Sequence, residues 1–309
     1  MATPYGAVLL IAFGGPDRMA DVRPFLANVL RGRRVPPERV EEVVHHYEMF
    51  DGHSPLAEHT VRQAEALRAD LDAHGPPLPV YVGMRNWTPY LHESLARMRG
   101  DGIRRAVGIV MAAHRSYSSW EQYHENVAEA RAQLGPEAPE IDYLGPWFDH
   151  PGFIEAQADR VADALRAIPA AQRPAARLIF TAHSIPEAMA AASPYVTQLV
   201  TSARLVAGRL NHPRWSVAYQ SRSGDPRTPW LGPDVAEVIR GLGGAGPEVV
   251  VVVPIGFVSD HIEVLYDLDT EARAEARRAG VAFHRAGTVM DHPAFVRMLG
   301  DLVRARAAA

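Results

Sequence analysis

Short, continuously apolar segments alternate with longer helical segments along almost the whole chain. The five consecutive valines at residues 249–253 are the clearest example, since a strand without polar alternation is one buried on both faces. Such strands, separated by helices, are typical of parallel sheets covered by helices on both sides, so the chain is expected to be α/β. The pattern predicts strands at residues 8–12, 80–82, 106–111, 141–144, 178–181, 216–219, 249–253 and 281–284, and helices at residues 22–30, 39–47, 56–73, 91–98, 120–133, 153–168, 195–210, 233–242, 263–278 and 293–307.

The chain length predicts two domains or one large α/β unit, because 309 residues exceed the roughly 150 residues of a typical domain. The alternation starts again after residues 146–151, which divides the chain into two similar halves at residues 1–148 and 149–309. No low-complexity linker separates the halves, so they are expected to share an interface. A cleft between them is the expected place for a ligand.

Composition excludes several classes of function. With 32 basic and 36 acidic residues the formal charge is 32 − 36 = −4, which argues against a broad nucleic-acid footprint. The sequence contains no cysteine and no lysine, so thiolate nucleophiles, cysteine-held iron–sulfur clusters, lysine Schiff bases and a Walker A lysine are excluded. No signal pattern and no apolar run of about 20 residues is present, so a soluble, cytoplasmic protein without stable membrane insertion is expected.

Two residues at predicted strand ends could carry chemistry. His183 follows the strand at residues 178–181, and Glu263 lies beyond the end of the strand at residues 249–253. Ligands of doubly wound sheets bind at the carboxyl ends of the strands, so both side chains are expected on that rim. An imidazole and a carboxylate suit divalent metals such as Fe2+, and they also suit proton abstraction near neutral pH. The alternative is a structural strand-end histidine and an ordinary acid at a helix N-terminus.

A file of three carboxylates starts at Glu263. Glu263, Asp267 and Glu271 are spaced i, i+4 and i+8, which places them on one face of a helix although such pairs repel by about 0.2–0.5 kcal/mol. The file is either a wet acidic surface or a path for cations and protons. The side chain of His261 is not expected to converge with that of Glu263, because positions two apart in the sequence are separated by roughly 200° around a helix. Asp260 is expected to cap the helix N-terminus.

Two segments of the first half could contact a ligand. Arg31, Arg33 and Arg34 form a basic patch after a predicted helix, and arginine clusters bind carboxylates or phosphates bidentately. The alternative is an ordinary charge cluster at a helix C-terminus. Residues 114–123 offer hydroxyls and aromatic rings, which could stack on a flat ligand or form a capping loop.

Seven short motifs occur in order along the chain. They are residues 9–16 (LLIAFGGP), 51–56 (DGHSPL), 81–85 (YVGMR), 182–187 (AHSIPE), 220–222 (QSR), 230–233 (WLGP) and 256–263 (GFVSDHIE). Together they resemble the ferrochelatase family, and most closely its bacterial, cysteine-free branch that metallates coproporphyrin III. The resemblance covers nearly the whole chain.

The resemblance implies two Rossmann-like, chelatase-type halves related by pseudo-symmetry, with a porphyrin in the cleft between them. It implies a monomeric lyase of haem biosynthesis that inserts its substrate Fe2+ into coproporphyrin III without an iron–sulfur cluster. Transient contact with other haem-pathway enzymes is compatible with such poorly soluble substrates. His183 and Glu263 match the family's catalytic, metal-contacting pair, Asp267 and Glu271 match its acidic path, and porphyrin contacts are implied for Phe13, Arg31, Tyr47, Ser54 and Tyr123.

Three positions depart from the pattern of that branch, and three alternative functions stay open. Phe13 stands where the branch commonly has a tyrosine that ligates iron in the product, Leu30 replaces a frequent arginine, and Asn86 replaces a frequent histidine. One alternative is a ferrochelatase for protoporphyrin IX, which has two propionates instead of four. Another is a chelatase for Co2+ or Ni2+, although such sites usually need two facing histidines. The third is a non-catalytic haem or porphyrin carrier, which would not need the carboxylate file.

Overall fold

The computed structural model describes residues 3–32, 35–223, 227–244 and 248–309. The chain divides into two units, each with its own four-stranded parallel sheet. Unit 1 contains Met1–Ala112, Tyr117–Pro146 and Met290–Ala309, and unit 2 contains Ala113–Ser116 and Trp147–Val289.

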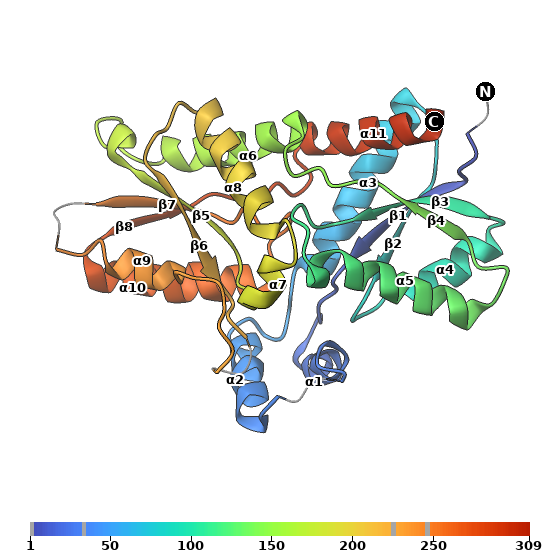
Figure 1. Ribbon diagram of the computed structural model, residues 1–309, viewed down its shortest axis with the longest axis horizontal. Coiled ribbons are helices and arrows are strands. Elements are labelled where there is room, and N and C mark those ends of the chain that lie inside the picture. Colours follow the sequence, from blue (N-terminus) through green and yellow to red (C-terminus); the bar gives the residue numbers. More distant parts are fainter. Residues whose placement is uncertain (1–2, 33–34, 224–226, 245–247) are drawn as a thin grey trace. The chain divides into compact units, whose positions relative to one another are not determined.

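The sheet of unit 1 has the strand order β2-β1-β3-β4. Its strands are β1 (Ala7–Ala12), β2 (Val80–Met84), β3 (Arg105–Val110) and β4 (Glu140–Tyr143). Helices α3 (Leu56–His74) and α11 (Pro293–Ala308) pack together on one face, and α4 (Leu91–Gly100) and α5 (Glu121–Leu134) pack together on the other (Figure 1). Helices α1 (Met19–Val29) and α2 (Pro37–Glu48) and a 3-10 turn (Tyr117–Ser119) complete the unit.

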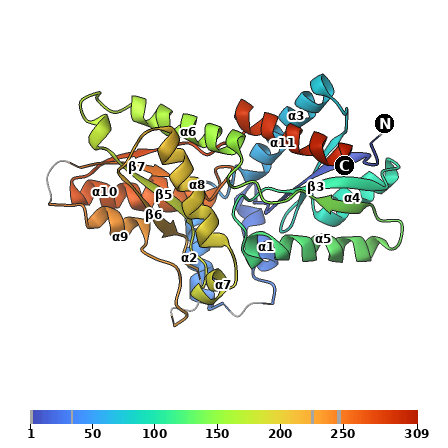
Figure 2. The same cartoon turned by 45° about the horizontal axis from the view of Figure 1, so that its top comes forward.

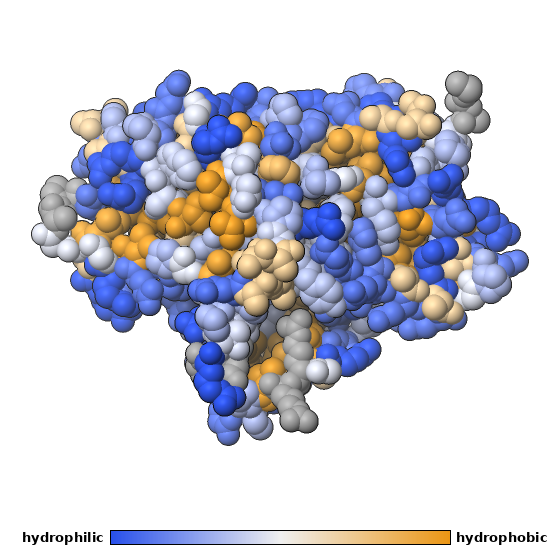
Figure 3. All heavy atoms as spheres, viewed as in Figure 1, coloured by the Kyte–Doolittle hydropathy of each residue, from blue (hydrophilic) through white to orange (hydrophobic). Residues whose placement is uncertain are grey.

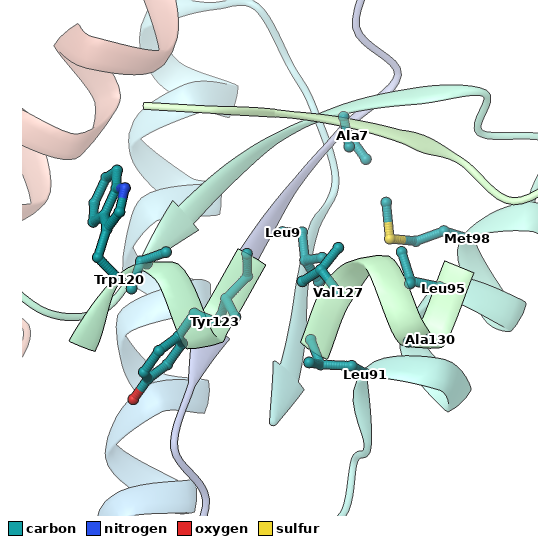
Figure 4. Packing of buried hydrophobic residues seen from close by; sticks show 12 residues of the cluster. Ala7, Leu9, Leu91, Leu95, Met98, Trp120, Tyr123, Val127 and Ala130 are labelled. Carbon is teal, nitrogen blue, oxygen red and sulfur yellow. The ribbon is translucent and has the colours of Figure 1, made fainter. Parts of the chain in front are cut away.

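One hydrophobic core cluster of unit 1 lies between its sheet and the helices α4 and α5 (Figure 4). Leu91, Leu95 and Met98 of α4 are at most 4% exposed and belong to the same buried cluster as Leu9 of β1. Their spacing of four and three residues places them on one stripe of the helix. This apolar stripe explains why the segment forms a helix lying on the sheet, since its burial stabilises the helix more than its intrinsic propensity does.

The sheet of unit 2 has the order β6-β5-β7-β8, which repeats the order of unit 1. Its strands are β5 (Arg177–His183), β6 (Trp215–Gln220), β7 (Val249–Val253) and β8 (Ala282–Arg285). Helices α6 (Pro151–Arg166) and α8 (Tyr195–Arg209) pack together on one face, and α9 (Val235–Arg240) and α10 (Arg273–Ala279) pack together on the other (Figures 1 and 2). A 3-10 turn (Arg173–Ala175), helix α7 (Glu187–Ala191) and the π-helix η3 (Val264–Ala272) complete the unit.

The predicted α/β class with two similar parallel-sheet halves is confirmed, and every predicted strand and helix overlaps an observed element. Two details differ. The helix predicted at residues 263–278 is a π-helix that continues into the α-helix α10. The sequence assigns residues 149–309 to one half, whereas Met290–Ala309 group with unit 1, because α11 packs against α3.

The visible surface is mostly hydrophilic, with smaller hydrophobic areas between the polar side chains (Figure 3). Among the described residues, no helix has the length and apolar character needed to cross a membrane.

A buried ion pair fastens α11 to α3. The guanidinium of Arg304 donates to the carboxylate of Asp70 over 2.9 Å, and the Asp70 side chain is only 7% exposed. Gly300 makes the approach possible, because a Cβ atom there would lie 2.0 Å from Asp70 Oδ2. On its exposed side Arg304 also binds Asp301, whose side chain is 66% exposed.

The two carboxylates therefore form a matched pair of test positions. Asp70→Asn should lower the free energy of unfolding by about 2–3 kcal/mol, because it leaves a partly buried guanidinium without its buried counter-charge. Asp301→Asn should cost less than about 1 kcal/mol, because its ion pair is exposed to solvent. Urea denaturation of both variants measures the difference, and equal losses would contradict this account of the α3–α11 contact.

Candidate active site

The site is built at the carboxyl end of strand β5. His183 is the last residue of β5, and its backbone pairs with Gln220, the last residue of β6. The hydroxyl of Tyr195 donates to the carbonyl of His183 over 2.9 Å, and Tyr195 is 5% exposed. The backbone of His183 is thereby held from two sides, which fixes the direction in which its ring leaves the strand.

The loop after β7 lies directly on the end of β5. The Gly256 amide donates to the Thr181 carbonyl over 3.0 Å. A Cβ atom at Gly256 would lie 2.5 Å from Ala182 Cβ and 2.7 Å from Ala182 Cα, so no larger residue fits without moving backbone. This close approach carries the following residues towards β5, and it explains how Glu263, ten residues after the end of β7, reaches His183.

His183 and Glu263 face each other, with Nε2 of the histidine 3.6 Å from Oε1 of the glutamate. Their side chains are 29% and 42% exposed, so water reaches both. Burial opposes the charged imidazolium, but the facing Glu263 carboxylate and the Ser184 carbonyl outweigh it and raise the pKa of His183. Burial likewise opposes the carboxylate, but His183 and His261 outweigh it and hold the pKa of Glu263 well below its usual range.

The tautomer of His183 follows from its second contact. Nδ1 bonds the carbonyl of Ser184, and a carbonyl can only accept, so Nδ1 carries the hydrogen. In the neutral ring the lone pair of Nε2 therefore points towards the Glu263 carboxylate. Two electron-rich atoms in this arrangement need a proton or a cation between them, so the pair is suited to hold either one.

The expectations for His261 and Asp260 are wrong, because the helix begins only at Ile262. His261 lies in the preceding loop, which lets its Nε2 approach Oε2 of Glu263 to 3.3 Å. Its ring also lies 4.6 Å from the ring of Phe257. Asp260 lies too early to be the N-cap, and its carboxylate accepts hydrogen bonds from Arg285 instead.

The carboxylate file continues along the π-helix η3. The Arg273 amide bonds the Leu268 carbonyl, an i→i−5 contact of the kind that defines a π-helix. Asp267 accepts a hydrogen bond from the hydroxyl of Ser221, whose φ of 60° lies in the left-handed region. Burial, together with the charges of Glu263 and Glu271, raises the pKa of Asp267 to about 7 against the effect of Ser221. Glu271 is exposed, so the file leads from His183 to solvent.

The described ranges contain no group of three or more His, Asp or Glu side chains arranged to hold a metal ion. His183 and Glu263 offer two protein ligands, and borderline divalent metals accept both donor types. A cation at this pair would therefore keep positions open for water or for a bound substrate.

The residues of unit 1 that the sequence singles out make two kinds of contact, between rings and between polar groups. The ring of Phe25 on α1 contacts those of Phe13 and Tyr47 at centroid distances of 6.2 Å and 6.1 Å. The guanidinium carbon of Arg85 lies 5.7 Å from the Phe13 ring and 4.4 Å from the Tyr123 ring. Phe13, Tyr47 and Tyr123 thus belong to one aromatic cluster, in which the two tyrosines are buried.

Ser54 and Arg31 make polar contacts instead of ring contacts. Ser54 is 2% exposed, and its amide donates to the carbonyl of Pro16. Arg31 is exposed, and its guanidinium donates to Asn28 over 2.8 Å. Arg33 and Arg34 of the predicted basic patch lie outside the described residues.

Two contacts of the site were not anticipated from the sequence. The Gln220 side chain donates to the Glu263 carbonyl over 3.3 Å, and Ser221 bonds Asp267. Both residues belong to the motif at residues 220–222, which is the sequence signal that could have pointed to them. Their roles depend on the pairing of β6 with β5.

The raised pKa of Asp267 predicts a pH-dependent stability. An exposed aspartate has a pKa of about 3.9, so the folded protein binds this proton more tightly than the unfolded chain. The resulting loss in free energy of unfolding is absent below about pH 4. It is complete above about pH 7, where the folded state must contain the charged Asp267 carboxylate. Asp267→Asn removes this loss, so its melting temperature relative to wild type should rise between pH 5 and pH 8, on the order of a few degrees.

Thermal melts of wild type, Asp267→Asn and the surface control Asp301→Asn test this expectation. A difference between Asp267→Asn and wild type that is the same at both pH values would contradict it, as would an equal pH trend in the control.

Comparisons with known proteins identify the family of this chain. The family model described as Ferrochelatase matches residues 5–307. The chain is 46% identical to a coproporphyrin III ferrochelatase of Streptomyces coelicolor, over 99% of this chain and 86% of that protein. It is also 46% identical to a ferrochelatase of Rhodopirellula baltica, over 98% of this chain and 86% of that protein.

Solved structures show the same fold at low sequence identity. The sirohydrochlorin chelatase SirB from Bacillus subtilis subspecies spizizenii, in complex with cobalt, has a TM-score of 0.57 at 12% identity, over 98% of this chain and 95% of that one. A multi-domain Deinococcus radiodurans protein with structural similarity to chelatases has a TM-score of 0.58 at 19% identity, over 97% of this chain and 55% of that one. With the family match over residues 5–307, the chain belongs to the ferrochelatase family.

Proposed function

We propose that this protein inserts Fe2+ into coproporphyrin III, forming Fe-coproporphyrin and releasing two protons. The observation that carries the proposal is the facing pair of His183 and Glu263 at the end of β5. Membership of the ferrochelatase family and the names of several relatives support the reaction and its substrate.

The first task of the site is proton removal. Metal insertion replaces two pyrrole N–H protons, so a base must stand near the ring centre. His183 is the proposed base, because its Nδ1–H is committed to Ser184 and its Nε2 is free to accept a proton next to a carboxylate. Glu263 stabilises the imidazolium that forms, in the way that its charge already raises the pKa of His183.

The second task is transfer along the carboxylate file. With a pKa of about 7, Asp267 can take up and release a proton near neutral pH, and Glu271 stands at the exposed end. The same oxygen atoms suit an incoming Fe2+ that must exchange water for protein ligands stepwise. The file is therefore proposed to serve cation entry, proton exit or both.

The assignment of the porphyrin is supported by the names of relatives such as that of Streptomyces coelicolor. The proposed contacts are Phe13, Arg31, Tyr47, Ser54 and Tyr123, and the cleft expected between the halves remains a prediction. The exposed guanidinium of Arg31 suits a propionate. Phe13 has no atom that can ligate iron, so product binding is proposed to rest on other contacts.

Protoporphyrin IX is the second candidate substrate. The relative from Rhodopirellula baltica is named simply as a ferrochelatase, and Leu30 removes one cation that the coproporphyrin branch often has. A carrier function is a weaker alternative, because a carrier would not need three carboxylates in file. We further propose a cytoplasmic monomer that contacts other haem-pathway enzymes only transiently.

Replacement of Glu263 separates an enzyme from a carrier. In an anaerobic assay with Fe2+ and coproporphyrin III, Glu263→Gln should lower turnover by at least about 100-fold, the scale of a lost acid–base group. Porphyrin binding, measured by fluorescence quenching, should stay close to that of wild type. Glu155→Gln is the matched control and should keep full activity, because Glu155 on α6 makes an exposed ion pair with Arg209 on α8.

A carrier gives a different pattern in the same assay. Wild-type protein would then bind the porphyrin without consuming it, and Glu263→Gln would change nothing. That outcome would exclude the proposed enzyme.

A further inference from the structure

Two aspartates flank the carboxylates of the proposed site. Asp260 lies three residues before Glu263, in the loop that leads into the π-helix. Asp269 lies two residues after Asp267, within the π-helix itself. Residues two apart lie on nearly opposite sides of a helix, so Asp269 is on the back of the helix when Asp267 is on its front.

One arginine binds both aspartates. Arg285, the last residue of β8, donates from Nη1 and Nη2 to the two oxygens of Asp260 over 3.2 Å and 3.1 Å. Its Nε donates to the two oxygens of Asp269 over 3.0 Å and 2.9 Å. The planar guanidinium thus connects the loop before Glu263 with the helix after Asp267, and the strand supplies a rigid base for it.

The contacts are mostly shielded from water. The side chains of Arg285, Asp260 and Asp269 are 14%, 22% and 25% exposed. Burial opposes the charge on Arg285, but the two carboxylates outweigh it and raise the pKa of the guanidinium. Thr288, which is 1% exposed, adds a hydroxyl hydrogen bond to Asp260 over 3.0 Å. Removing the arginine would remove the positive charge that these two shielded carboxylates share.

We propose that Arg285 is a positioning residue, which holds Glu263 and Asp267 in the register that His183 requires. The inference rests on the proposed iron insertion, since it explains how the file is kept in place for that reaction. The hydrogen bonds of Arg285 reach Asp260, Asp269 and the Ala286 carbonyl, so we infer that it acts on the site through the two aspartates.

A neighbouring arginine offers a matched comparison. Arg273 also binds Asp269 over 2.9 Å, but it lies one turn along the same helix and does not join the helix to the loop. Its guanidinium carbon lies 4.8 Å from the ring of Phe283 on β8. Arg273→Met therefore removes an Asp269 ion pair of similar length without breaking the connection to Asp260.

The kinetic test compares wild type with Arg285→Met, Arg285→Lys and Arg273→Met in anaerobic iron insertion, below the melting temperature of every variant. Arg285→Met should lower kcat/KM for Fe2+ by about 10–100-fold, the usual effect of removing a group that orients metal ligands. KM for the porphyrin should change less than about 2-fold. Arg285→Lys keeps the positive charge but lacks the planar guanidinium, so its kcat/KM should lie between those of wild type and Arg285→Met. Arg273→Met should stay within about 3-fold of wild type.

Equal losses of kcat/KM for Fe2+ in Arg285→Met and Arg273→Met would overturn the inference. A change in KM for the porphyrin as large as the effect on Fe2+ would also overturn it. If Arg285→Met does not fold, the ordering of Arg285→Lys and Arg273→Met still decides the question. A crystal structure of Arg285→Lys gives a readout independent of turnover: the distance from His183 Nε2 to Glu263 Oε1 should exceed the 3.6 Å of the wild type. An unchanged distance would contradict positioning, whereas an inactive wild type would contradict only the proposed function.

Discussion

The hydrogen bond from the Gly256 amide to the Thr181 carbonyl is the contact on which the site depends. It brings the loop after β7 onto the end of β5 at a distance that excludes any Cβ atom on residue 256. Two strands that are neighbours in the sheet thereby present His183 and Glu263 to each other. The chemistry is placed by sheet topology, because the carboxyl ends of parallel strands always meet at one edge.

The same contact brings several charged side chains close together, and the fold provides partners for Glu263 and Asp267. Glu263 faces two histidines, and Asp267 accepts from Ser221 and has a pKa of about 7. Arg273 and Arg285, which bind Asp269 on the opposite side of the helix, carry positive charge. A carboxylate file that would repel on an isolated helix is thus tolerated where protons and cations can be exchanged.

The sheets and most helices could be predicted because their signals are local. The valines of β7 and the stripe of Leu91, Leu95 and Met98 report burial directly. The π-helix, the approach of His261 to Glu263 and the docking of α11 could not, since each depends on contacts distant in the sequence. The positions of His183 and Glu263 at strand ends were predictable from topology, whereas the roles of Gln220 and Ser221 required the pairing of β5 with β6.

Coproporphyrin III is the substrate proposed for this site. The most direct measurement offers purified protein equimolar coproporphyrin III and protoporphyrin IX with Fe2+ under anaerobic conditions, and follows the loss of each free porphyrin separately. Coproporphyrin III is expected to be consumed first, while protoporphyrin IX persists. Preferential consumption of protoporphyrin IX, or binding of both without consumption of either, would contradict the proposal.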